Sequence, residues 1–208
     1  MRIFGIDPGS DRTGYGCIET DGSRHRVIMS GAISTPSLTP FPEKLLAIHQ
    51  RLAALLNECR PDCVAIENLF YATNARSALK LGHARGVAML AAVEAGCPVV
   101  EYSPAEVKRA VVGYGRAEKH QVQQMIKLLL GLEQAPSPHD TADALAVAIC
   151  HLNSMPPAGL KAPVVEADLP PSPRLRRTAE ARSAKAGQVR LPKNAKTKTW
   201  RQYRPPAS

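Results

Sequence analysis

The chain has few cysteines and no long apolar run, and each of these two shortages argues against a class of protein. Its five cysteines are odd in number and have no framework spacing, which argues against a secreted protein held together by disulfides. Cys59 and Cys63 have no second ligand pair nearby, so we expect buried thiols rather than a zinc site. No apolar run is long enough to cross a bilayer, and Asp7 and Asp11 interrupt the N-terminal one. We therefore expect a soluble, cytoplasmic protein.

Most of the chain also lacks net charge. Residues 1–153 contain 15 Lys and Arg and 15 Asp and Glu, and their charges cancel. Residues 154–208 contain 12 Lys and Arg but only 3 Asp and Glu, so this segment carries the whole net charge of +9. That segment also holds nine of the 18 prolines. We therefore expect a neutral globular domain over residues 1–153, followed by a basic, Pro-rich and disordered tail over residues 154–208.

Apolar runs separated by breakers predict an α/β fold with a mixed sheet. The first two strands form a hairpin, and a helix connects the third strand to the fourth. Because such a crossover joins parallel strands, the fourth strand is expected to lie parallel to the first. Strands are predicted near residues 3–6, 15–18, 27–33, 63–66 and 98–102, and helices near residues 42–60, 74–96, 104–113, 117–130 and 137–152.

Four acids are candidates for one shared site. Asp7 and Glu67 each follow a buried apolar strand, and these strands are expected to be neighbours whose carboxyl ends meet at one edge. Asp140 and Asp143 share a helix face with the apolar Val147, so that face points inward. Carboxylates this close would repel one another by roughly 4 kcal/mol per pair at a moderate effective dielectric. Two Mg²⁺ or Mn²⁺ ions would relieve the repulsion and support hydrolysis of a phosphodiester.

Each acid has a simpler interpretation when it is taken singly. Asp7 can form a turn and cap its own loop. Asp140 can cap its helix, and Glu67 can pair with a basic residue such as Arg76. Two acids at strand ends together with two on one helix face nevertheless favour the metal site.

The sequence resembles the RuvC family of bacterial Holliday junction resolvases over about residues 1–153. The resemblance rests on four stretches in the family's order: Gly5–Ser10 with Thr13–Gly16, Ala65–Glu67, Asn74–Gly86 and Asp140–Ala146. It implies an RNase H-like fold with a mixed five-stranded sheet flanked by helices on both faces. It also implies a Mg²⁺-dependent endonuclease that resolves Holliday junctions by symmetric paired nicks, and a homodimer that works with the branch-migration proteins RuvA and RuvB.

The resemblance further implies that the catalytic, metal-binding acids are Asp7, Glu67, Asp140 and Asp143, with two Mg²⁺ ions per active site, which Mn²⁺ can replace. Some members of the family have a histidine in place of the third acid. Here Asp140 keeps the three-residue spacing to Asp143, while His139 lies one place away. We therefore assign Asp140, and expect His139 to be an exposed helix-start residue or a group behind the ligands.

Five residues are candidates for contact with DNA. The resemblance supports Phe70 as a wedge between bases or a stacking platform, the alternative being a lid over the core. Lys108 and Lys119 match basic positions that the family uses near the cleaved strand, the alternative being ordinary solvated charges. Arg76 and Lys80 follow Phe70 on the next helix. The basic tail would add non-specific, salt-sensitive affinity for phosphates.

Small residues have two expected roles. Gly9 is expected to keep the turn beside Asp7 compact, whereas Gly14 and Gly16 leave room for a DNA backbone to approach. The small-residue helix over residues 75–95 is the candidate interface of a two-fold dimer, the alternative being packing against the sheet. Dimerisation and packing against the sheet can use opposite faces of that helix.

Two other functions fit parts of the sequence. The first hairpin also resembles the phosphate-gripping hairpin of actin-like and sugar-kinase ATP-binding domains. Those proteins generally need a second, duplicated half, and this chain has no internal repeat. A non-catalytic junction-binding protein would be expected to have lost some of the four acids, and all are present. The sequence therefore favours the nuclease.

Overall fold

The computed structural model describes residues 1–68 and 74–155, and these residues contain every strand and helix that the sequence predicts. The elements are, in order, β1 (Arg2–Asp7), β2 (Arg12–Thr20), β3 (His25–Ser34), α1 (Phe41–Cys59), β4 (Cys63–Glu67), α2 (Ala75–Glu94), β5 (Val99–Tyr102), α3 (Pro104–Val112), α4 (Lys119–Leu129) and α5 (His139–Ser154). The predicted tail falls almost wholly beyond the described residues.

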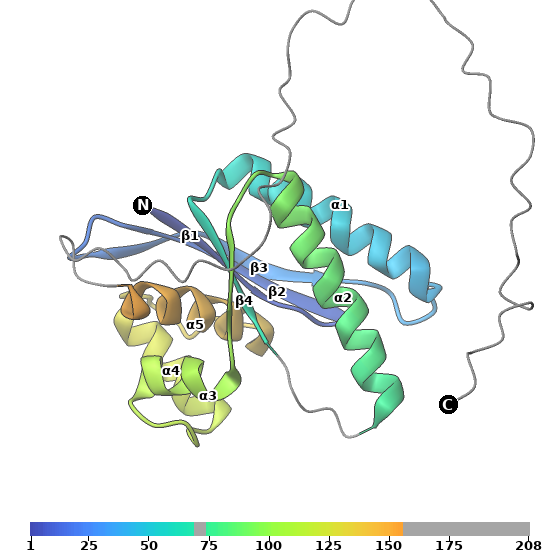
Figure 1. Ribbon diagram of the computed structural model, residues 1–208. Helices are drawn as coiled ribbons and strands as arrows, with labels where there is room; N and C mark the ends of the chain where they lie inside the picture. The colour runs from blue at the N-terminus through green and yellow to red at the C-terminus, as the bar shows by residue number, and fades with distance from the viewer. Residues whose placement is uncertain (69–73, 156–208) are drawn as a thin grey trace, which may run out of the picture. The chain divides into compact units, whose positions relative to one another are not determined.

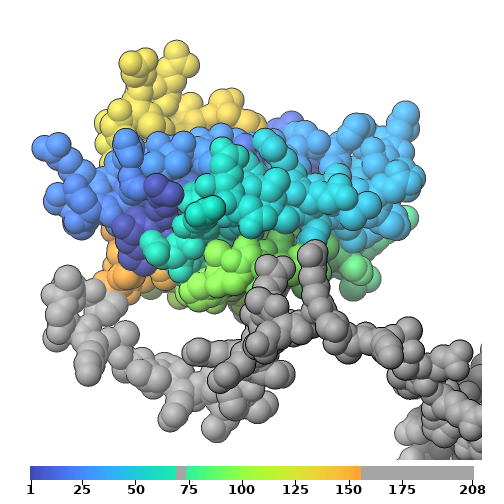
Figure 2. Space-filling view, turned by 90° about the horizontal axis from the view of Figure 1, so that it is seen from above, coloured from blue at the N-terminus to red at the C-terminus, as the bar shows by residue number. Residues whose placement is uncertain are grey.

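The sheet is mixed, as predicted, with the strand order β3-β2-β1-β4-β5. Strand β1 pairs antiparallel with β2 and parallel with β4, because α1 carries the chain back to the starting end of the sheet. Helices α1 and α2 cover one face and α3, α4 and α5 cover the other (Figure 1). Seen from above, the atoms of the first three strands and α1 form a continuous surface coloured from blue to cyan (Figure 2).

Alternation along the central strands decides which side chains face α5. In β1, Phe4 and Ile6 pack in the core beneath α1 and α2, whereas Ile3 packs in the core beneath α5. Because successive side chains of a strand point to opposite faces, Asp7 lies on the same side as Ile3. The same count places Glu67 on the α5 side, together with Ala65 of β4.

Glycines let α5 lie directly on the sheet. A Cβ on Gly5 would overlap the carbonyl oxygen of Ala144, and one on Gly14 would overlap the carbonyl oxygen of Asp140. The expectation that Gly14 leaves room for DNA is therefore wrong, because the first turn of α5 fills that room.

The same correction applies to Gly16, where a Cβ would come within 2.5 Å of the Leu145 side chain. In contrast, a Cβ on Gly9 would overlap the carbonyl oxygen of Arg12, so Gly9 keeps the turn after β1 compact, as predicted.

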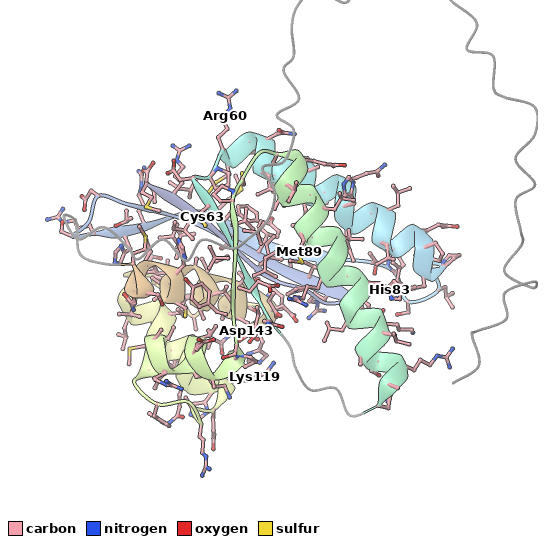
Figure 3. The ribbon with its side chains drawn as sticks, viewed as in Figure 1. Arg60, Cys63, His83, Met89, Lys119 and Asp143 are labelled. Atoms are coloured by element: carbon pink, nitrogen blue, oxygen red, sulfur yellow. A yellow bond between two sulfur atoms is a disulfide. The ribbon has the colours of Figure 1, made fainter. Side chains whose placement is uncertain are left out.

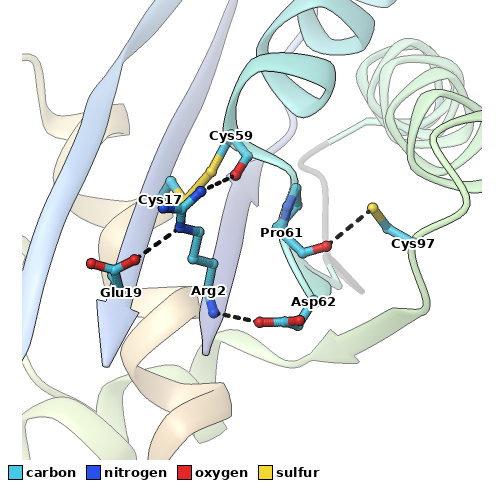
Figure 4. The surroundings of a disulfide bond; sticks show 7 residues. All are labelled: Arg2, Cys17, Glu19, Cys59, Pro61, Asp62 and Cys97. Carbon is cyan, nitrogen blue, oxygen red and sulfur yellow. Dashed lines mark hydrogen bonds and ion pairs between the residues drawn. A yellow bond between two sulfur atoms is a disulfide. The ribbon is translucent and has the colours of Figure 1, made fainter. Parts of the chain in front are cut away.

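Cys59, which was expected to be a buried free thiol, is joined to a second cysteine. Cys17 of β2 faces the α1 side of the sheet, Cys59 ends α1, and a disulfide connects them across 42 residues of sequence (Figure 4). The pairing depends on how α1 docks on β2, which cysteine spacing does not reveal. Cys63 and Cys150 are buried free thiols, and Cys97 is a partly buried one.

Membrane insertion finds no support in the described helices. None of them is long and apolar enough to cross a bilayer.

Candidate active site

Two of the predicted acids meet at the ends of neighbouring strands. The parallel register pairs Ile6 with Ile66, which sets Asp7 beside Glu67 at the carboxyl ends of β1 and β4. Both side chains are partly buried on the α5 side of the sheet, close enough for a hydrogen bond between the two carboxyls to raise the pKa of Asp7 and lower that of Glu67. The rigid centre of the sheet therefore holds this pair.

The other two acids come from the first turns of α5. Residue Asp7 pairs with Gly14 in the β1–β2 register, and α5 approaches Gly14 at Asp140. The side chains of Asp140 and Asp143 are 30% and 22% exposed, and Val147 farther along the same face is fully buried, as predicted. No side chain caps the start of α5, so the interpretation of Asp140 as a helix cap is wrong.

Each of the α5 acids faces its own basic residue. The Nη1 atom of Arg12 lies 3.4 Å from Oδ2 of Asp140, and Nζ of Lys119 lies 3.4 Å from Oδ2 of Asp143. Figure 3 shows Lys119 and Asp143 side by side. The negative charge of Asp143 raises the pKa of Lys119, so this lysine stays positively charged.

Arg12 was not among the predicted site residues. The signal that could have identified it is its place at the start of β2, two residues before Gly14, the glycine that faces the backbone of Asp140.

The site is short of positive charge. Burial, together with the negative charges of Glu67 and Asp143, raises the pKa of Asp7 to about 8. Burial also raises the pKa of Glu67 and of Asp143, against the opposing charge of Lys119. Crowded, desolvated carboxylates favour protons or metal ions as partners.

A cavity of about 270 Å³ opens at these side chains. Its polar lining comes from Asp7, Glu67, Asp143, Lys108 and Lys119, and its apolar lining from Pro104, Val107 and Val122. Asp140, held by Arg12, is not part of the lining. Within residues 1–68 and 74–155, no three acid, histidine or cysteine side chains converge as a ready-made metal site. The donor chemistry nevertheless fits Mg²⁺, because every candidate ligand is a carboxylate and burial raises the pKa values of Asp7, Glu67 and Asp143.

The predicted DNA-contact residues fall into two groups. Lys108 and Lys119 line the cavity. Arg76 and Lys80 are exposed at the start of α2 and do not line it, and Nζ of Lys80 lies 5.8 Å from the centre of the Phe41 ring. Phe70 lies outside the described residues.

His139 is the first residue of α5 and is exposed, as predicted.

The raised pKa of Asp7 predicts a stability that falls with pH when no metal is present. Between its ordinary value of 3.8 and about 8, the folded chain binds this proton more tightly than the unfolded chain does. The free energy of unfolding therefore decreases as pH rises through this window. Asp7→Asn removes the ionisation, so in EDTA at pH 8 it should stabilise the protein by on the order of 2 kcal/mol, or about 4–8 °C in Tm.

Thermal unfolding followed by circular dichroism at pH 5 and pH 8 measures this effect. The gain should be small at pH 5, where Asp7 of the wild type is protonated. Glu58→Gln, at an exposed acid of α1, is the matched control and should leave Tm unchanged at both pH values. An equal effect of Asp7→Asn at the two pH values would show that ionisation of Asp7 is not the cause of the gain.

Comparisons with known proteins agree over the described residues. The family model for "Crossover junction endodeoxyribonuclease RuvC" matches residues 3–151. The RuvC protein of Alkaliphilus metalliredigens is 56% identical over 154 residues, which cover 74% of this chain and 94% of that protein.

Solved structures show the same likeness. The RuvC structure of Thermus thermophilus is 38% identical with a TM-score of 0.67. The T. thermophilus RuvC in complex with a Holliday junction substrate is 36% identical with a TM-score of 0.68. Each match covers 74% of this chain and 94% of the other.

Proposed function

Since this chain belongs to the family of RuvC crossover junction endodeoxyribonucleases, we propose that it resolves Holliday junctions by Mg²⁺-dependent hydrolysis at Asp7, Glu67, Asp140 and Asp143. The observation that carries the proposal is the cavity that Asp7 and Glu67, from two strand ends, line together with Asp143 of α5, which has Asp140 three residues before it on the same helix. A T. thermophilus relative of similar fold has been solved in complex with a Holliday junction substrate. Recombination and DNA repair are the processes that such an activity serves.

The four acids would hold two Mg²⁺ ions, which Mn²⁺ can replace. When bound, such ions supply Lewis-acid activation of the attacking water and of the leaving oxygen. The protein contributes rigid placement. Asp7 and Glu67 end two central strands, and the start of α5, which carries Asp140 and Asp143, packs directly on Gly14. This support would fix the backbone positions of the four ligands relative to the scissile phosphate.

Basic residues around the cavity would position the DNA and stabilise charge. Lys108 and Lys119 line the cavity, where a cation offsets the negative charge that develops on the phosphate. Arg76 and Lys80, exposed on α2, would contact the phosphates of an adjacent strand. We assign Phe70 to a base contact on the family resemblance alone. The basic residues of 154–208 would add non-specific, salt-sensitive affinity beyond the nuclease domain of residues 1–153.

A homodimer would place two such sites on the two symmetry-related strands of a junction. Helix α2 has the surface for it: Ala84 and Ala88 are buried inside the protomer, whereas Leu79 and Leu90 are 65% and 52% exposed. The exposed leucines line a groove of about 500 Å³ that also includes Gly82 and Gly86. A Cβ on either glycine would meet nothing within 4 Å, so a partner's side chains have room to enter.

The expected partners of the dimer are the branch-migration proteins RuvA and RuvB. This expectation follows from the family and from no described surface.

A synthetic four-way junction tests the proposed activity. We expect paired, symmetric nicks with Mg²⁺, none in EDTA, and little cutting of a linear duplex with the same arm sequences. Strands labelled one at a time and resolved on a denaturing gel show both nicks and their symmetry. Junction binding without nicks in Mg²⁺ would favour the non-catalytic alternative, and a requirement for ATP would favour the kinase-like one.

A further inference from the structure

Among the described residues, Arg12 is the one basic residue at the site that the proposed function does not use. It begins β2, its side chain is half exposed, and its guanidinium lies 3.4 Å from Asp140. Its backbone is fixed, because its carbonyl oxygen packs against Gly9 and the buried Thr13 donates its hydroxyl to the Gly9 carbonyl at 2.8 Å. The turn therefore presents Arg12 to the first turn of α5 at a fixed distance.

We propose that Arg12 and the metal ion compete for Asp140: Arg12 holds this carboxylate in the metal-free protein and releases it when the ion binds. The inference rests on the proposed function, since it requires Asp140 to be a ligand. It makes Arg12 a positioning residue, which acts on the reaction through Asp140.

The arrangement of the acids supports this competition. Asp7, Glu67 and Asp143 line the cavity, and Asp140, held by Arg12, does not. In the described part of the chain the acids do not converge as a ready-made metal site. Sharing an ion with the other three acids would turn Asp140 toward the cavity and away from the guanidinium.

Lys119 makes the comparable contact with Asp143, but from inside the cavity. Its Nζ lies 3.4 Å from Asp143, and both residues belong to the cavity lining. Lys119 can therefore stay beside its acid while the cavity fills. Arg12 holds its acid outside the lining, so this is the pair that we expect to separate.

The expected effect is modest, because the Arg12 side chain is 50% exposed and solvent screens the pair. Removing the guanidinium should tighten Mn²⁺ binding about two- to fivefold. The direction of the change in Mn²⁺ affinity decides the question more than its size does. If Arg12 instead held Asp140 ready for the ion, its removal would weaken binding.

The test is Mn²⁺ binding to the metal-free, full-length protein without DNA, measured by electron paramagnetic resonance of the free ion. Arg12→Gln should bind about two- to fivefold more tightly than wild type, and Arg12→Lys should stay near wild type. Arg26→Gln is the matched control, because it also removes one positive charge. Arg26 lies on β3 and pairs with Glu19 of β2 at 2.6 Å rather than with one of the four acids. This substitution should leave the affinity unchanged.

A double-mutant cycle with Asp140→Asn separates competition for this carboxylate from a general change in charge. In the Asp140→Asn background, Arg12→Gln should have no effect. Unchanged or weaker binding by Arg12→Gln in the wild-type background would overturn the proposal, as would an equal gain in both backgrounds.

The outcomes also distinguish this proposal from the proposed function. If wild type binds Mn²⁺ and Asp7→Asn binds it poorly, the metal site stands whatever Arg12→Gln does. If Asp7→Asn binds Mn²⁺ as wild type does, the metal assignment fails and the role of Arg12 fails with it.

Discussion

Replacement of Asp7 by Asn should reduce cleavage of a four-way junction by about 10³-fold while junction binding is retained. The pKa of Asp7 is raised to about 8 because this carboxyl is buried and also feels the charges of Glu67 and Asp143. Asn has nearly the same shape but supplies no negative charge, so it is a poor ligand for Mg²⁺. The fold should survive, because the substitution relieves repulsion in the metal-free site.

Single-turnover cleavage and gel-shift binding in EDTA measure the two halves of this prediction. Glu58→Gln, the exposed acid on α1, should cut and bind as wild type does. An Asp7→Asn protein that cuts at the wild-type rate would show that the reaction does not depend on this carboxylate. Loss of both junction binding and cutting would point instead to a role for Asp7 in DNA contact.

Gly14→Ala should both destabilise the protein and inactivate it. The added Cβ would overlap the backbone carbonyl of Asp140, which cannot move aside as a flexible side chain can. The first turn of α5 would have to shift, at a cost of about 2–4 kcal/mol or about 4–16 °C in Tm. Asp140 and Asp143 would shift with it, so activity should fall even where the protein remains folded.

Substitutions at two further glycines should have smaller effects on Tm and on cleavage than Gly14→Ala. Gly16→Ala should cost less, because the nearest atom belongs to the Leu145 side chain, which can adjust. Gly115→Ala is the control, since its Cβ would come no closer than 3.4 Å to another atom. A Gly14→Ala protein with the Tm and cleavage rate of Gly115→Ala would contradict the tight contact between α5 and β2.

Much of this site follows from sequence patterns that have a geometric meaning. A crossover helix makes β1 and β4 parallel neighbours, so the acids that end them, Asp7 and Glu67, meet at one edge. The i,i+3 spacing of Asp140 and Asp143 placed both on the face of α5 that turns inward. These inferences needed only periodicity and the rule of right-handed crossovers.

The glycines show where such patterns are insufficient. A glycine in a strand indicates close approach, but not what approaches. Gly14 and Gly16 were therefore assigned to DNA, whereas α5 is the neighbour. Counting alternation from Asp7 across the hairpin would have placed both glycines on the α5 side.

Pairings between distant residues were the least predictable features. Arg12 and Asp140 are 128 positions apart, and the Cys17–Cys59 disulfide spans 42. Each depends on how a helix docks on β2, which is decided by packing across the whole core. The spacing of residues in the sequence does not predict how these helices dock.

Crystals of the metal-free protein soaked in Mn²⁺ and measured at the manganese absorption edge would test the central claim most directly. We expect anomalous peaks within coordination distance of Asp7, Glu67, Asp140 and Asp143, with Asp140 turned away from Arg12. Manganese bound only elsewhere, with Asp140 still paired to Arg12, would contradict the assignment of these acids as the metal ligands.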